Sequence, residues 1–175
     1  MRRLLLAAGA VMLLGGCAGR MAEAPAPLSA EAVLKDKDGK QVGVATLIQT
    51  NEGTRIAVTG YRLTAGTRGL HIHDAGVCQG PDFTSAGGHF NPGGKKHGKL
   101  NPEGAHAGDL PNLVIGAAGD GTIDVTTKAV TLSPGPTSLL GGKGTAIVMH
   151  AMPDDERTDP AGNSGDRIAC GVVTP

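Results

Sequence analysis

From residue 31 onward, apolar and β-branched residues come in short runs that are separated by turn residues. These runs cover residues 32–36, 41–50, 55–63, 112–132, 145–150 and 167–173. Breaks such as Asp38-Gly39 and Asp120-Gly121 are typical of hairpin turns. No stretch of this region keeps a helical period of 3.6 residues for three turns. The pattern therefore predicts about eight short strands in an all-β, antiparallel sandwich or barrel.

Two segments of the same region, residues 74–112 and 151–166, lack the alternation of a strand. Both are rich in Gly, Pro and Asp, and the first also contains lysines. Irregular loops longer than about 12–15 residues are uncommon in a compact domain and are usually functional or disordered. The first segment contains three of the six histidines. Because disordered linkers rarely collect histidine, we expect two long functional loops.

Composition supports a loop-rich β protein and excludes one class of partner. The 175 residues include 29 glycines and 11 prolines, and the formal net charge is zero. Nucleic-acid binding needs a basic face, of which there is no sign. We therefore expect no nucleic-acid partner.

The first residues have the character of an export signal. Arg2 and Arg3 precede an apolar run at residues 4–14, which is too short for a comfortable transmembrane helix. The following "LLGGC" resembles the lipobox of bacterial lipoproteins, which implies a signal peptide at 1–16 and a lipid on Cys17. The alternative is ordinary secretion with cleavage near "AEA" and loss of Cys17.

Residues 17–30 are then the lipidated N-terminus and a flexible Ala/Pro tether, and residues 31–175 are the folded domain. The expected location is the bacterial cell envelope or periplasm, with membrane contact only through the lipid. If Cys17 takes the lipid, Cys78 and Cys170 remain as a pair in an oxidising compartment, where a disulfide is favoured. The alternative is two buried thiols.

The histidines are concentrated in and beside the two long loops. His71 and His73 are two residues apart in a strand, so they share one face while Ile72 faces the core. Two such histidines can occur on a solvated strand by chance. However, all six histidines fall in the first loop or at strand ends next to the two loops, namely His71, His73, His89, His97, His106 and His150. This clustering predicts a metal site.

The order of these motifs resembles that of the copper,zinc superoxide dismutases. It reads H-x-H, a cysteine, G-G-H-F-N-P, H, H-x-x-D, V-x-H and R-x-A-C-G-V, and the resemblance covers about residue 31 to Pro175. It implies an eight-stranded antiparallel Greek-key β-barrel or sandwich with two long functional loops.

The resemblance implies one copper and one zinc per subunit. The copper ligands would be His71, His73, His89 and His150. The zinc ligands would be His89, His97, His106 and Asp109. His89 would bridge both metals. Four imidazoles suit Cu(II), and three histidines with one carboxylate suit tetrahedral zinc.

Three further roles follow from the resemblance. Asp154 would link His71 to His97, whereas Asp155 is interpreted as a solvated acid. Arg167 would dock a small anion beside the copper, with His89 as its catalytic partner. A Cys78–Cys170 disulfide would then fix the strand that holds Arg167.

The implied reaction is the disproportionation of superoxide to dioxygen and hydrogen peroxide. The alternative is a non-catalytic exported copper- and zinc-binding module with the same fold. The second loop is shorter than in eukaryotic members, lacks their lysine-bearing segment and has Ala161 where a channel threonine is expected. Lys95 and Lys96 are candidates to attract the substrate, or are a solvated turn. A homodimer and a monomer both remain open.

Overall fold

The computed structural model describes residues 28–175, which form nine strands and one short 3-10 helix. The strands are β1 (Ser29–Asp36), β2 (Gln41–Thr50), β3 (Gly53–Gly60), β4 (Gly66–Arg68), β5 (Leu70–His73), β6 (Leu113–Ile115), β7 (Gly121–Thr127), β8 (Ala146–His150) and β9 (Arg167–Val172). The helix is η1 (Thr84–Ala86). The all-β prediction is confirmed. The expected signal peptide, Cys17 and most of the tether lie outside the described residues.

Alternating side chains build the first layer of the molecule. In β1, Ala30, Ala32 and Leu34 are buried, whereas Glu31 and Lys35 are exposed. Successive side chains of a strand point to opposite faces, so this alternation places every second residue in the core. β1 begins two residues before the expected start of the domain.

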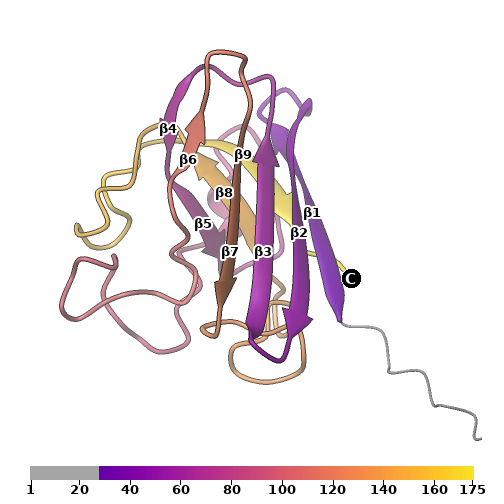
Figure 1. Cartoon of the computed structure of the whole chain (residues 1–175), viewed down its shortest axis with the longest axis vertical. Helices are drawn as coiled ribbons and strands as arrows, with labels where there is room; N and C mark the ends of the chain where they lie inside the picture. Colours follow the sequence, from indigo (N-terminus) through magenta and orange to yellow (C-terminus); the bar gives the residue numbers. More distant parts are fainter. Residues whose placement is uncertain (1–27) are drawn as a thin grey trace, which may run out of the picture.

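The strands form a seven-stranded antiparallel sheet in the order β5-β8-β9-β1-β2-β3-β7 and a two-stranded sheet of β4 and β6. In Figure 1, β1, β2, β3 and β7 lie in front of β5, β8 and β9. The chain passes from β7 at one edge to β8 near the other, which is a Greek-key type of connection. The sheet thus curls into two layers around one core.

Gly69 explains the ninth strand. It is the single residue between β4 and β5, which pair with β6 and β8, respectively. A Cβ at Gly69 would lie 2.8 Å from Ser164 Cβ, so the second loop approaches closely here. Residues 66–73 are therefore one extended segment that changes partner at a glycine and is counted as two strands.

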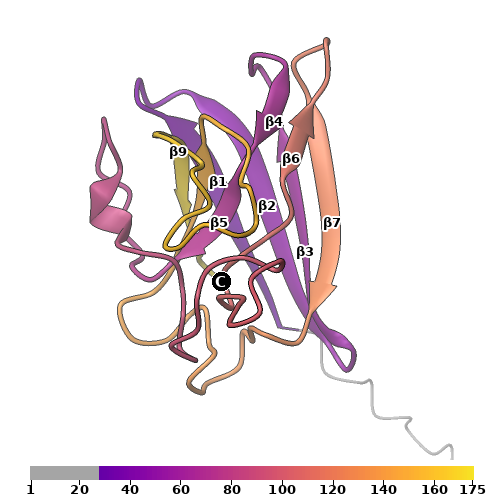
Figure 2. The same ribbon diagram turned by 90° about the vertical axis from the view of Figure 1, so that its left-hand side faces the viewer.

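β5 and β8 are buried on both faces. Leu70 and Ile72 of β5 belong to the main hydrophobic core, whereas His71 and His73 face the other way. The long loops cover that second face and lie together beside the sheet (Figure 2). The face of β5 that carries the two histidines therefore lines an enclosed polar site between the sheet and the loops.

A disulfide fastens the first loop to the sheet. Cys78 and Cys170 are bonded, with a Cα–Cα distance of 5.7 Å, which confirms the favoured pairing. Around it lies a second small core of Phe83, Ala86, Ala146, Val148 and Cys170. The loop is thus fixed both covalently and by apolar contact.

Residues 28–175 contain no helix that is long and apolar enough to span a membrane.

Candidate metal centre

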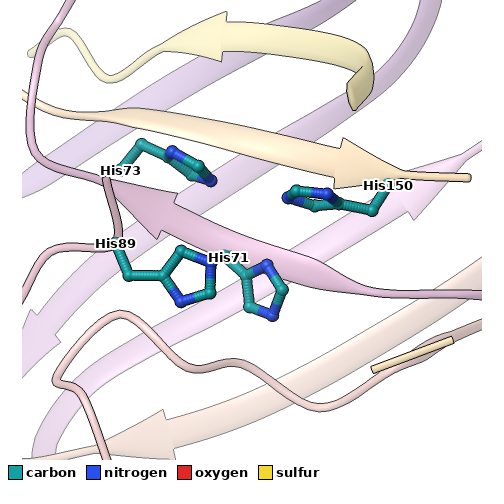
Figure 3. A group of neighbouring side chains, drawn as sticks. All are labelled: His71, His73, His89 and His150. Carbon is teal, nitrogen blue, oxygen red and sulfur yellow. The ribbon is translucent and has the colours of Figure 1, made fainter. Parts of the chain in front are cut away.

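Four imidazoles converge on one point between β5, β8 and the first loop (Figure 3). His71 and His73 come from β5, His150 ends β8, and His89 belongs to the loop. One nitrogen from each ring lies within 4.8 Å of the others. A single ion with bonds of about 2 Å can bridge such a span. We call these four side chains the copper group.

The outward nitrogen of three of these rings is held by an oxygen. His71 Nε2 lies 2.9 Å from Asp154 Oδ2, and His73 Nδ1 lies 3.0 Å from the Gly87 carbonyl oxygen. His150 Nδ1 lies 3.1 Å from the Gly165 carbonyl oxygen. Each contact fixes the orientation of a ring. The other nitrogen of each ring therefore points into the group.

The inward nitrogens have no hydrogen-bond partner within residues 28–175, which is expected of atoms that bind a metal ion. They are His71 Nδ1, His73 Nε2, His89 Nε2 and His150 Nε2, all buried and without a hydrogen-bond partner among the described residues. Buried polar atoms are rarely left unpaired in a folded protein. Four such nitrogens facing one another are what a bound metal ion would satisfy. The residues thus fit copper.

A second set of ligand atoms lies on the other side of His89. Asp109 Oδ1 is 2.9 Å from His89 Nδ1, 3.1 Å from His97 Nδ1 and 3.3 Å from His106 Nδ1. His106 Nδ1 is also 3.3 Å from His89 Nδ1. In a zinc tetrahedron with bonds of about 2.0–2.1 Å, neighbouring ligands are about 3.3 Å apart. This zinc group has those dimensions.

His71 also lies within 4.8 Å of His89, His97 and Asp109. We assign it to the copper group because its Nε2 already contacts Asp154, while its Nδ1 has no partner. His106 completes the zinc group instead. The seven candidate ligands thus gather around two points with His89 between them, and their division between copper and zinc stays a prediction.

Burial keeps the imidazoles of His71, His73 and His150 neutral. Loss of water lowers the pKa of His71 to about 4, of His73 to about 2 and of His150 to about 3. The positive charge of Arg167 adds to the effect at His73 and His150. Neutral rings are the form that binds metal. The apolar surroundings thus prepare these nitrogens for an ion.

The carboxylate of the zinc group is kept ionised by its hydrogen bonds. Burial alone would raise the pKa of Asp109, but the contacts with His89 and with the Gly98 amide hold it well below its usual range. Asp109 Oδ2 accepts hydrogen bonds from the Gly98 and His106 amides, both at 2.9 Å. These bonds leave Oδ1 directed at the three imidazoles.

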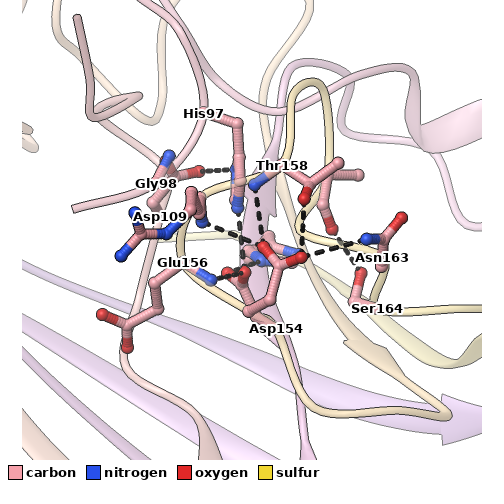
Figure 4. Close-up of polar contacts among 12 residues, drawn as sticks. His97, Gly98, Asp109, Asp154, Glu156, Thr158, Asn163 and Ser164 are labelled. Carbon is pink, nitrogen blue, oxygen red and sulfur yellow. Dashed lines mark hydrogen bonds and ion pairs between the residues drawn. The ribbon is translucent and has the colours of Figure 1, made fainter. Parts of the chain in front are cut away.

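Asp154 contacts both groups from the side away from the inward nitrogens, and Figure 4 shows it beside His97 of the zinc group. Its Oδ1 lies 2.9 Å from His97 Nε2, and its Oδ2 lies 2.9 Å from His71 Nε2. The Glu156 amide donates a further hydrogen bond to Oδ1, at 2.6 Å. Burial would raise the pKa of Asp154, but these contacts lower it overall. One carboxylate thus contacts one ring in each group.

The comparisons with known proteins agree with this geometry. Residues 41–173 match the family model for copper/zinc superoxide dismutase. The chain is 49% identical to superoxide dismutase [Cu-Zn] 2 of Aquifex aeolicus, with 83% of this chain and 86% of that protein covered. It is 40% identical to the enzyme of Caulobacter vibrioides, with 83% and 85% covered. The crystal structure of a SOD-like protein from Bacillus subtilis has a TM-score of 0.79 at 39% identity, covering 82% of this chain and 97% of that one.

The chain belongs to the copper/zinc superoxide dismutase family. Arg167, which the family resemblance singled out, opens β9 beside the copper group. Its two terminal nitrogens donate hydrogen bonds to the Phe83 and Gly87 carbonyl oxygens, both at 2.7 Å. Gly87 thus contacts both Arg167 and His73. Since the disulfide holds the same loop, it also fixes the partners of Arg167.

Two acids of this dismutase fold were not recognised from the sequence. Asp155 is exposed, but its carboxylate accepts bonds from the Arg157 and Thr158 amides, the Thr158 hydroxyl and the Asn163 amide group. Asp155 is thus a solvated acid, as interpreted from the sequence, and it also orders the second loop through these bonds. Asp159 Oδ1 accepts a hydrogen bond of 2.8 Å from the His97 amide. An Asp side chain often accepts a hydrogen bond from the backbone two residues on, and this turn tendency could have revealed Asp155.

The remaining candidates of the dismutase loops are on the surface. Lys96 contacts Asp159 at 3.3 Å and is exposed, and Lys95 is also exposed. The carbonyl oxygen of Ala161 accepts a hydrogen bond from the Ser164 hydroxyl. Lys96 thus ties the first loop to the second.

Proposed function

We propose that this protein disproportionates superoxide at a copper ion that shares an imidazole with a zinc ion. The supporting observation is His89. Its Nδ1 lies among the zinc group, and its buried Nε2 has no partner and faces the copper group. A histidine so placed can contact two cations through its two ring nitrogens. Copper and zinc are the metals of the family to which the chain belongs.

The division of labour follows from the ligand sets. Copper would be held by His71, His73, His89 and His150, and zinc by His89, His97, His106 and Asp109. Bound copper would supply one-electron chemistry, by which one superoxide is oxidised to dioxygen and another takes up an electron and two protons and leaves as hydrogen peroxide. Zinc gathers the first loop into a closed site, which is a structural role.

Arg167 would attract and position the substrate. Its guanidinium is partly buried and retains donors beyond the two that bind Phe83 and Gly87. An arginine can bind a small anion through charge-assisted hydrogen bonds. Its anchoring to carbonyls of the disulfide-bonded loop limits its freedom. Superoxide would therefore meet a charge already fixed beside the copper group.

His89 would also handle a proton. Its contact with Asp109 through Nδ1 holds the ring while Nε2 faces the copper group. Nε2 can therefore take up a proton without rotation of the ring and return it to the reduced substrate. Asp154 keeps the neighbouring rings of His71 and His97 in place during this exchange.

The deciding experiment is elemental analysis of the purified protein, with a superoxide-removal assay before and after copper addition. We expect activity to follow copper content and to fall in Arg167→Ala at unchanged metal content. Equal and negligible rates in both proteins would instead favour the non-catalytic metal-binding module.

We also infer that the protein is exported, with a signal peptide at 1–16, a lipid on Cys17, a tether to residue 30 and the enzyme domain at 31–175. The Cys78–Cys170 disulfide supports an oxidising compartment such as the periplasm. Labelling with a radioactive fatty acid in a bacterial host tests the anchor. The label should enter the wild-type protein and be absent from Cys17→Ala; a labelled Cys17→Ala protein would contradict it.

A further inference from the structure

Met152 is an exposed thioether beside the copper group. The described residues contain two methionines, of which Met149 is fully buried and Met152 is 55% exposed. The backbone of Met152 is well fixed: its amide donates to the Ser164 carbonyl oxygen at 2.8 Å, and its carbonyl oxygen accepts from the Gly69 amide at 2.7 Å. The side chain is therefore accessible on a rigid backbone.

The first carbons of this side chain lie against Gly165. Gly165 has a φ of +73°, and a Cβ at that position would lie 2.9 Å from Met152 Cγ and 3.5 Å from Met152 Cβ. The carbonyl oxygen of the same glycine lies 3.1 Å from His150 Nδ1. One residue therefore separates the methionine side chain from the imidazole of a copper-group histidine.

We propose that Met152 is a modification site, oxidised to the sulfoxide by hydrogen peroxide, and that this change reaches His150 through Gly165. The thioether sulfur gains one oxygen and loses two electrons, and hydrogen peroxide is reduced to water. The oxidant is the product of the reaction proposed above, so its origin rests on that proposed function. Exposure favours Met152 over the buried Met149 as the residue attacked.

The consequence follows from the contact with Gly165. A sulfoxide is polar and chiral, whereas a thioether is apolar and flexible. The oxidised side chain favours water over the surface of Gly165, which frees the backbone that holds His150 Nδ1. Outer partners of metal-ligating histidines typically contribute 10–100-fold to metal affinity. We therefore expect copper release to accelerate on the order of tenfold, at the low end of that range.

The site itself is tested by treating the copper- and zinc-loaded protein with hydrogen peroxide and mapping its peptides by mass spectrometry. Met152 should gain one oxygen atom before Met149, which serves as the internal control. Copper transfer to a chelator should accelerate in the wild-type protein, recover after methionine sulfoxide reductases and stay unchanged in peroxide-treated Met152→Leu. An unmodified Met152, or equal acceleration in Met152→Leu, would overturn the proposal.

The origin of the oxidant is tested by supplying superoxide in place of peroxide, with and without catalase. Oxidation of Met152 should occur without catalase and disappear with it. If peroxide accumulates and Met152 remains intact, the modification site is wrong. If added peroxide oxidises Met152 but the metal-loaded protein removes superoxide no faster than buffer alone, the proposed enzymatic function fails, and the chemical assignment of the site stands.

Discussion

Gly162 leaves no room for a side chain behind the zinc group. A Cβ at this position would lie 1.7 Å from Asp154 Oδ1 and 2.7 Å from His97 Nε2. The residue also has a φ of +62°, which favours glycine. The bridge from Asp154 to His97 therefore requires a glycine in the second loop.

Gly162→Ala should weaken zinc binding by roughly 10–100-fold, because the methyl group displaces the carboxylate that orients His97. Competition with a chromogenic chelator measures the affinity. Gly142→Ala is a matched control, since Gly142 has a φ of +56° and no atom within 4 Å of the added Cβ. If both variants lose zinc equally, backbone strain rather than the displaced carboxylate is responsible.

Asp154→Asn should lower the affinity for both metals, since one amide cannot accept hydrogen bonds from His71 and His97 at the same time. The expected loss is about 10–100-fold at each site. Isothermal titration with each metal separates the two. A loss confined to copper would contradict the role of Asp154 as the link between the groups.

At the scale of single residues, the sequence indicated the candidate ligands and one of their supports, Asp154, but not the other supports. The ligands are recognisable because a metal demands particular side chains at fixed spacing, as in His71 and His73. Asp154 followed from its distance to His150 along the chain. Gly162 and Asp159 act through contacts between two loops, and no local pattern in either loop reports such a contact.

At the scale of elements, the two long loops dock on each other. The Leu100 amide donates a 2.9 Å hydrogen bond to the Glu156 carbonyl oxygen, and the His97 amide donates to Asp159. Asp155 folds the second loop into the shape that presents these acceptors. The loops therefore form one unit around the zinc group.

Asp159→Ala should increase amide hydrogen exchange in residues 95–104, because the His97 amide loses its acceptor. A buried donor left unpaired costs about 1–3 kcal/mol. Asp159→Asn keeps an oxygen that can accept the same bond, so it should restore most of the protection. Equal exchange in the two variants would show that the bond has no part in ordering the loop.

Reduction of the disulfide should lower catalytic efficiency more than metal content. Cys78 and Cys170 hold the loop that supplies the Phe83 and Gly87 carbonyl oxygens to Arg167. The chain-entropy model assigns a bridge of this span roughly 4–5 kcal/mol of stability. Assays below the melting temperature, with metal content measured in parallel, separate the two effects. An unchanged kcat/KM after reduction would argue that β9 alone positions the arginine.

At the scale of the whole molecule, the buried histidines make the metal-free protein sensitive to acid. In the unfolded chain a histidine has a pKa near 6.5, whereas in the fold His71, His73 and His150 have values of about 4, 2 and 3. The unfolded state therefore binds more protons as the pH falls below about 6.5. Each such histidine removes about 1.4 kcal/mol of stability per pH unit until its folded pKa is reached.

The melting temperature of the metal-free protein should accordingly fall between pH 7 and pH 4, and these groups should have no effect above pH 7.5. Added zinc and copper should raise it and move the fall to lower pH, since metals compete with protons for the same nitrogens. Calorimetry across this range, with and without the metals, checks both expectations. A melting temperature that does not change when zinc and copper are added would contradict the proposed metal site.

The fold as a whole was accessible from the sequence because alternation in segments such as β1 and β3 reports one buried face. The interruption at Gly69 was not accessible, since it reflects the approach of Ser164 from a distant loop. Nor does alternation reveal that β5 and β8 are covered on both faces. That burial depends on the loops, whose conformation the long-range contacts decide.

The four inward nitrogens of the copper group have a further consequence for assembly in the cell. Four imidazole nitrogens fixed around one point can bind any late first-row divalent cation. In the Irving–Williams series the affinity of such a site for Ni²⁺ and Zn²⁺ is lower than for Cu²⁺, but both ions still bind. When copper is scarce, a more abundant ion without a suitable redox couple would occupy the site instead. The ion bound by this enzyme therefore depends on which metal ions are supplied while the protein folds, as much as on the geometry of the copper group.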